Sequence, residues 1–186
     1  MANITISEPE CISGKPKMLR YVCCCFFARN LTSFYLQIHL MMAIAVKTQT
    51  QQTGVSQITP GVNVLDFFQI HILPELQDRS HRPVVKATAI KYVSVFRRQF
   101  SRENLVHLLP LLISHLSSTV IVVHTYAAYA IERILVTRDQ VGGRNIPKIG
   151  STELQAVIEP LFNGLFAIIE LQQNENDYAM KCIMRS

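Results

Sequence analysis

Cysteine is the side chain that could give this chain nucleophilic, redox or metal chemistry, and the sequence contains five. Four of them fall within the first 25 residues, three consecutively, and no pair has Cys-x-x-Cys spacing. A zinc site or a disulfide framework needs spaced ligands that can converge on one metal or one bond. We therefore interpret the cysteines as reduced thiols of an intracellular protein. They are Cys11, Cys23, Cys24, Cys25 and Cys182.

Histidine and carboxylate side chains give no clearer sign of a reaction centre. His107 and His115 lie eight residues apart on one predicted helix, with no cysteine or carboxylate at ligand spacing, so we expect surface or hydrogen-bonded histidines. Gly142-Gly143-Arg144 could cradle an anion, but it follows no predicted strand, which favours a flexible connector. The sequence also lacks the phosphate-loop, dinucleotide, zinc-protease and nucleophile-elbow motifs. It therefore predicts a non-enzymatic protein with no catalytic, cofactor-binding or metal-binding residue.

Basic residues form the most informative polar set. Lys86, Lys91, Arg97 and Arg98 fall within an arc of about 140° on a predicted helix over residues 82–99. Such a stripe could meet an acidic protein partner, because second helices of solenoid repeats line the concave surface. A solvated helix face is the equal alternative, since cations near a helix C-terminus also oppose its dipole favourably. A net charge of +5 is too small to suggest nucleic-acid binding.

Internal repeats predict the elements that must carry this stripe. The segment VVKATAIKYVSVF at residues 84–96 aligns with VVHTYAAYAIERI at residues 122–134, and YAAYAIER from Tyr126 aligns with YAMKCIMR from Tyr178. Each intervening segment carries a proline followed by apolar residues. Repeating helix pairs of about 40 residues with a proline-bent first helix are typical of HEAT-type α-solenoids. The prolines are Pro74, Pro110 and Pro160.

The predicted fold class is therefore all-α, a HEAT-repeat α-solenoid of the armadillo-like kind. We expect antiparallel helices with no strand between residues 62 and 170, and a β-sheet there would contradict the repeat interpretation. Ser101 is the expected N-cap of the third helix. The expected helices cover residues 62–77, 82–99, 101–116, 120–136 and 152–170.

The predicted core lies between stacked helix pairs. Alanines at positions 127 and 130 would let the helices approach closely, and an exposed Ala130 would contradict the repeat alignment. The expected buried residues are Phe67, Phe68, Val85, Ala89, Phe96, Leu109, Leu112, Tyr126, Ala127, Ala130, Ile134, Leu161 and Phe166.

Three domain segments follow from the composition. We expect residues 1–42 to be an anomalous N-terminal segment, residues 43–61 a polar linker with the remnant of a preceding helix, and residues 62–186 three HEAT-type pairs, the last incomplete. An apolar stretch over residues 18–46 is interrupted by Arg29 and falls short of about 20 consecutive apolar residues, so no membrane association is expected. We expect an internal part of a longer solenoid, because terminal repeats need polar caps.

Several strings resemble one known family. They are FFQIHILPELQDRSHRPVVKATAIKYVSVFRRQ, LLPLLISHL, VVHTYAAYAIERIL and NENDYAMKCIMRS, with KTQTQ upstream. These strings are similar to the middle of the CAS-type exportins of the importin-β superfamily, over about residues 43–186. Residues 1 to about 42 do not resemble that family, and the family's members are several times longer.

The resemblance implies a nuclear export receptor that carries importin-α to the cytoplasm in complex with Ran-GTP and shuttles between nucleus and cytoplasm. It implies protein partners, with no cofactor, nucleic acid or membrane. A generic HEAT scaffold for another protein is the alternative. A membrane-anchored or secreted protein is a third, and it rests only on residues 18–46. The Lys86–Lys91–Arg97–Arg98 stripe is the expected partner-binding set, and the resemblance assigns no further contact residue.

Overall fold

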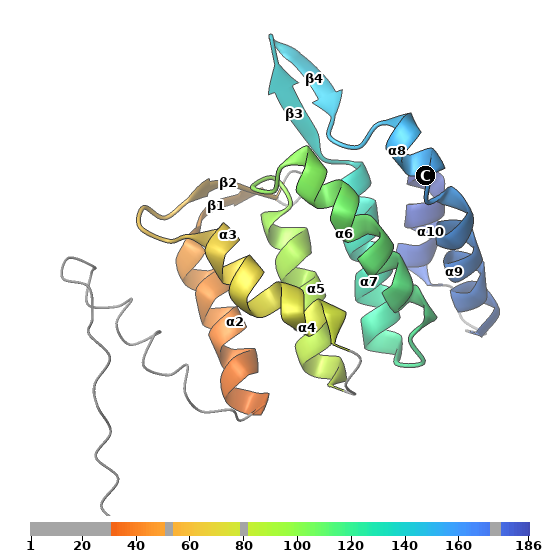
Figure 1. Ribbon diagram of the computed structural model, residues 1–186, viewed down its shortest axis with the longest axis horizontal. Coiled ribbons are helices and arrows are strands. Elements are labelled where there is room, and N and C mark those ends of the chain that lie inside the picture. Colours follow the sequence, from red (N-terminus) through yellow and green to blue (C-terminus); the bar gives the residue numbers. More distant parts are fainter. Residues whose placement is uncertain (1–30, 51–53, 79–81, 172–175) are drawn as a thin grey trace, which may run out of the picture.

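Two layers of helices make up the protein (Figure 1). The computed structural model describes residues 31–50, 54–78, 82–171 and 176–186. In one layer, which we call the second-helix layer, four helices follow one another side by side, each packed on the next. They are α2 (Leu31–Ala45), α5 (Pro83–Phe96), α7 (Ile121–Leu135) and α10 (Asp177–Arg185).

The first-helix layer covers one side of these four helices. Each of its members is joined by a short connection to the helix that it pairs with, so α4 packs on α5, α6 on α7 and α9 on α10. This arrangement confirms the predicted all-α repeat of helix pairs. The layer comprises the run α3 (Val64–Phe67), η2 (Phe68–Ile72) and α4 (Leu73–Gln77), then α6 (Arg102–Ser114) with η3 (His115–Ser117), and α9 (Ile158–Leu171) after the short α8 (Ser151–Gln155).

Local signals set the helix boundaries close to their expected positions. Ser101 is the N-cap of α6, because its hydroxyl accepts from the Asn104 amide at 3.2 Å. A π-helical turn, η2, ends just before Pro74, and the amide of Leu73 donates to the Phe68 carbonyl five residues back. The wider turn accommodates a proline that lacks an N–H and crowds the preceding turn.

The third proline, Pro160, does not bend a helix, contrary to our expectation. The predicted helix over residues 152–170 is broken into α8 and α9 at residues 156 and 157, which places Pro160 in the first turn of α9. There the missing N–H has no partner to lose. The close approach of α9 to η3 depends instead on Gly164, where an added Cβ would lie 3.0 Å from the Leu116 Cβ.

The described residues form two antiparallel hairpins, and one of them shows that the prediction of no strand between residues 62 and 170 was wrong. Hairpin β3 (Arg138–Val141) and β4 (Arg144–Pro147) lies inside the 62–170 span. Its two-residue turn places Gly142 and Gly143 at φ of 59° and 77°, which only glycine adopts readily. No described side chain of these strands is buried, so the sequence lacks the alternation that predicts a strand, and its glycines indicated a connector instead. The hairpin occupies the connection between α7 and α8, and the helix pairs on either side remain intact. The expectation that any sheet in this span would contradict the repeats was therefore also wrong, because a connection between two pairs can form a hairpin without disturbing their packing.

The region before residue 62 also differs from the expectation. Helix α2 crosses the predicted boundary between residues 42 and 43, and it buries Ile38, Met42 and Ala45 against the core. The expected linker forms the hairpin of β1 (Val46–Thr50) and β2 (Gly54–Ile58), which the Thr59 amide joins to the Ala45 carbonyl at 3.0 Å. The helix is therefore a full member of the second-helix layer. Residues 1–30 of the predicted N-terminal segment lie outside the described residues.

The core matches the predicted set except at two positions. Tyr126 is half-buried, and Phe166 is 51% exposed. The buried face of α9 follows Leu161, Leu165 and Ile168, and Phe166 is one residue, about 100° of turn, away from that face. Ala130 is fully buried, which agrees with the repeat alignment. In the part of the chain that the structure describes, no helix is both long and apolar enough to cross a membrane.

Candidate protein-interaction surface

The predicted basic stripe does not form one solvent-facing surface. Lys86 and Arg97 are buried, and Lys91 and Arg98 are half-buried. Helix α5 lies between α2 and α7 and also packs under α4, so nearly every side of it is covered. The expectation of an exposed stripe is therefore wrong for Lys86 and Arg97, because a helix wheel shows polarity and not which neighbours cover each side.

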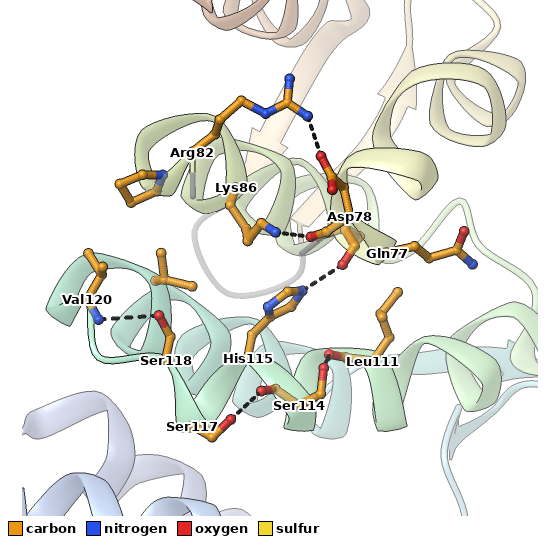
Figure 2. Close-up of a pocket in the computed structure, with 13 residues that line it drawn as sticks. Gln77, Asp78, Arg82, Lys86, Leu111, Ser114, His115, Ser117, Ser118 and Val120 are labelled. Carbon is orange, nitrogen blue, oxygen red and sulfur yellow. Dashed lines mark hydrogen bonds and ion pairs between the residues drawn. The ribbon is translucent and has the colours of Figure 1, made fainter. Parts of the chain in front are cut away.

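Lys86 and His115 bind the carboxyl end of α4 (Figure 2). The Lys86 ammonium donates to the Asp78 carbonyl, and the His115 imidazole is 3.0 Å from the Leu76 carbonyl. Arg82 forms ion pairs with Glu75 and Asp78, both at 2.7 Å. Lys86 and His115 thus satisfy backbone carbonyls at the end of the helix, whereas Arg82 binds side-chain carboxylates.

Apart from Glu75, the residues of this cluster line a cavity of about 510 Å³ between the α4–α5 and α6–α7 pairs. Burial and, secondly, the nearby Lys86 charge lower the pKa of His115, although the hydrogen bond to Leu76 opposes them. Burial raises the pKa of the Glu75 carboxyl, and the charges of Arg82 and Lys86 oppose this shift. The cluster is thus explained by helix capping, and it gives no reason to place a partner at Lys86.

Arg97 has a similar local role. Its guanidinium donates to the Ser94 carbonyl at 2.5 Å. Burial is the main cause of the lowered pKa of Arg97, and the neighbouring Arg133 adds to it. At the end of α5, the Arg98 carbonyl accepts from the buried Lys148 ammonium at 2.8 Å.

Lys91 lies apart from these residues, in a groove on the face of the second-helix layer that is turned away from the first-helix layer. It lines two adjoining cavities, of about 270 Å³ and 620 Å³, and Tyr126 lines both with it. We call the two together the second-helix groove. The first cavity is lined mainly by apolar side chains from α2, α5 and α7, including Tyr35, Val84 and Val122. The second is lined by polar, aromatic and cationic side chains from α5, α7 and α10.

Tyrosines and cations alternate in the second cavity. The Arg133 guanidinium lies 5.1 Å from the Tyr129 ring centre, and the Lys181 ammonium lies 5.7 Å from that of Tyr178. The two tyrosine rings pack edge to face with their centres 5.3 Å apart. Stacked cations and tyrosines of this kind are common at protein interfaces, where they offer both apolar area and hydrogen-bond donors.

Of the residues that line the groove, only Lys91 was in the predicted partner-binding set, although those on α5, α7 and α10 lie largely within the aligned repeat segments. Lys91, Tyr129 and Lys181 are equivalent positions of successive repeats, and so are Tyr126 and Tyr178. Equivalent positions of stacked helices lie on one face of a solenoid. A search of the aligned second helices for shared faces would have found the groove, whereas a wheel of a single helix could not.

The candidates for chemistry remain scattered in the structure. His107 is exposed and has no described histidine, cysteine or acidic cluster around it; no three such side chains are placed to hold a metal ion among the described residues. Cys182 is a buried free thiol, and burial raises its pKa to about 12. Cys11, Cys23, Cys24 and Cys25 lie outside the described residues.

Comparison with known proteins gives one consistent result. A family model for Cse1 matches residues 27–131, and one described as CAS/CSE protein, C-terminus, matches residues 132–186. The match thus begins at residue 27, earlier than the resemblance expected from about residue 43. Exportin-2 of Mus musculus and of Homo sapiens are each 43% identical over 152 residues, and that of Danio rerio is 44% identical. These matches cover 80% of this chain and 15% of each relative.

A solved structure is similar over nearly the whole chain. The exportin Cse1 in its cargo-free, cytoplasmic state superposes with a TM-score of 0.71 at 27% identity. The match covers 90% of this chain and 18% of that one. The chain therefore spans less than a fifth of the length of the proteins that it resembles.

Proposed function

The chain belongs to the CAS/CSE family, and from this we propose that it forms part of a nuclear export receptor that carries importin-α from the nucleus to the cytoplasm in complex with Ran-GTP. The observation that carries the proposal is 43% identity to exportin-2 over 80% of the chain, within a fold that has the same helix-pair architecture as Cse1. The proposed receptor shuttles between the two compartments and performs no chemical reaction of its own.

The mechanism that fits this fold is flexing of the solenoid. Each helix pair packs mainly on its neighbours, as α5 packs on α2 and α7, and α7 packs on α5 and α10. Small rotations between successive pairs therefore add up to a change of curvature in a long array. In this proposal the described pairs contribute a short section of the arch, and the second-helix groove offers the surface that meets a protein partner.

A segment of this size is expected to hold only part of the binding surface. Stable protein interfaces bury roughly 800 Å² on each partner, and a receptor that wraps its cargo uses more. We therefore expect the isolated chain to show weak, salt-sensitive binding to importin-α and Ran-GTP, and not to export importin-α alone. Salt sensitivity follows from the cations in the groove.

Two binding experiments test the proposal. In the first, the immobilised chain is mixed with importin-α and with Ran locked in its GTP state, at low and at high salt. In the second, residues 31–186 replace the matching segment of a full-length exportin-2, and the chimera is tested with the same two proteins. We expect ternary binding by the chimera only. A chimera that folds but binds neither protein would contradict the proposed function, and tight, salt-insensitive ternary binding by the isolated chain would contradict its partial role.

A further inference from the structure

The second-helix groove has a polarity along its length. Its α2 end is lined by the exposed apolar side chains Val84 and Val122 together with Tyr35. Its α10 end is lined by Tyr129, Tyr178 and cations. A ligand that fills the whole groove must therefore be apolar at one end and polar at the other.

The cations of the groove lie at its middle and at its α10 end. They are Lys91, Arg133 and Lys181, one from each of three successive helices of the second-helix layer. No aspartate or glutamate is among the described residues that line either cavity. Lys91 has no carboxylate within ion-pair distance among the described residues, and together with burial its charge lowers the pKa of His39 in the adjoining cavity. The groove is therefore electropositive along its centre.

Neighbouring carboxylates leave much of this charge unneutralised. Glu132 is buried and is shared between Arg133, at 3.3 Å, and Arg185, at 3.9 Å. Asp177 is 3.8 Å from Lys181, and both side chains are well exposed, so water screens this pair strongly. Buried Arg97 adds a further positive charge close to Arg133.

We infer that the second-helix groove binds an extended acidic segment of a protein partner, with an apolar side chain of that segment between α2 and α7 and its carboxylates on Lys91, Arg133 and Lys181. This inference deepens the proposed function and rests on it for the identity of the receptor. The carboxylates replace the counter-ions of the three cations, and the tyrosines hold the segment by contact with its backbone and stems.

The dimensions fit a short peptide. Packed helices lie about 8–10 Å apart, so the path from α2 across α5 and α7 to α10 is about 25–30 Å long. An extended chain rises about 3.3 Å per residue, so about eight or nine residues span the groove. A helix would be a poorer occupant. The lining changes from apolar to cationic along the length of the groove, whereas an amphipathic helix separates its apolar and polar side chains around its circumference.

Fluorescence anisotropy with a defined probe tests the inference on the full 186-residue chain. The probe is a fluorescein-labelled peptide of about nine residues with Leu-Phe at one end and alternating Asp and Glu at the other. One control peptide replaces the acidic residues by Lys and Arg, and another replaces Leu-Phe by Gly-Ser. We expect saturable binding of the first probe alone, weakening as salt rises.

Charge-reversal variants locate the site. K91E/K181E is expected to weaken peptide binding at least about ten-fold, which corresponds to about 1.4 kcal/mol. The matched control R138E/R144E makes the same change of charge on the exposed β3–β4 hairpin, away from the groove, and should bind within about two-fold of the unmodified chain. Because Lys91 is half-buried, its substitution can disturb the fold. K181E alone and Y178A change the groove at exposed positions and leave Lys91 in place. Circular dichroism checks the fold of each variant.

Three results would overturn the inference: equal binding of the basic peptide, equal loss in R138E/R144E, or tighter K91E/K181E-sensitive binding of single-stranded RNA or anionic vesicles than of the acidic peptide. The chimera separates this outcome from the proposed function. If the chimera carrying K91E/K181E binds importin-α and Ran-GTP normally, and the unmodified chain does not bind the peptide, only the groove assignment is wrong. If the chain binds the peptide but the folded chimera binds neither importin-α nor Ran-GTP, only the proposed export function is wrong.

Discussion

The Lys148 ammonium donates to the Phe100 carbonyl at 2.6 Å, across 48 residues of sequence. The same group donates to the Arg98 carbonyl and lies 3.4 Å from the Asp139 carboxylate. Lys148 follows the β3–β4 hairpin directly, and its side chain is only 5% exposed. A single buried cation therefore joins the base of the hairpin to the segment that follows α5.

Lys148→Met tests this junction. The variant keeps the stem but removes the donor from the buried Phe100 carbonyl and the half-buried Arg98 carbonyl, so the free energy of unfolding should fall by about 2 kcal/mol. Urea denaturation followed by circular dichroism measures the loss. Lys181→Met is the matched control, because its ammonium is exposed and its ion pair is screened, and it should change the free energy by less than about 0.5 kcal/mol. Equal losses in both variants would show that the junction has no special role.

Ala130→Phe tests the packing of the repeats. Ala130 is fully buried on α7, so a benzyl group should overpack the core and lower the free energy of unfolding by about 1–3 kcal/mol. Ala167→Phe on the exposed side of α9 serves as the control and should be close to neutral. An Ala130→Phe chain that is as stable as the unmodified one would contradict the stacking of α7 described above.

Stability should depend on pH through two half-buried histidines, His71 and His115. Burial lowers the pKa of His71, and burial with the Lys86 charge lowers that of His115. A lowered pKa in the folded state means that the unfolded chain takes up protons first as the pH falls. Stability is therefore full above the unfolded pKa of about 6.5 and is lost between that value and the lower folded pKa.

His115→Gln isolates the His115 contribution. The glutamine amide can still donate to the Leu76 carbonyl but does not titrate near neutral pH. The free energy of unfolding measured between pH 7.5 and 5 should then fall less steeply than in the unmodified chain. His107→Gln replaces a solvent-exposed histidine instead and serves as the matched control, with no change of slope expected. An unaltered slope in His115→Gln would refute the assignment.

Exposed apolar side chains on α9 and α10 should drive self-association. Phe166, Leu171 and Met184 are 51%, 74% and 82% exposed. Phe166→Ser combined with Met184→Ser should lower the apparent mass in light scattering at high concentration without loss of thermal stability. Phe96→Ser, at a buried position, should instead unfold the chain at lower temperature. If the double variant associates as strongly as the unmodified chain, another surface is responsible.

The sequence determined the helix pairs, because their signals are local and repeated. The spacing of apolar residues, the cap at Ser101 and the alignment of residues 84–96 with residues 122–134 each depend on neighbours within a few turns, or on positions that recur. The burial of Ala130 was predicted from the same repeat alignment.

Tertiary structure decided which polar residues reach the surface. Lys86 and Arg97 have the helix positions of a solvent-facing stripe, yet α4, α2 and α7 cover α5. The two side chains therefore donate to backbone carbonyls. The groove around Lys91 forms only when three helices from different repeats stand side by side. The hairpin at residues 138–147 likewise depends on a distant anchor, since Lys148 bonds to carbonyls about 50 residues earlier. Burial and surface charge are properties of the assembled layers, and no single helix contains them.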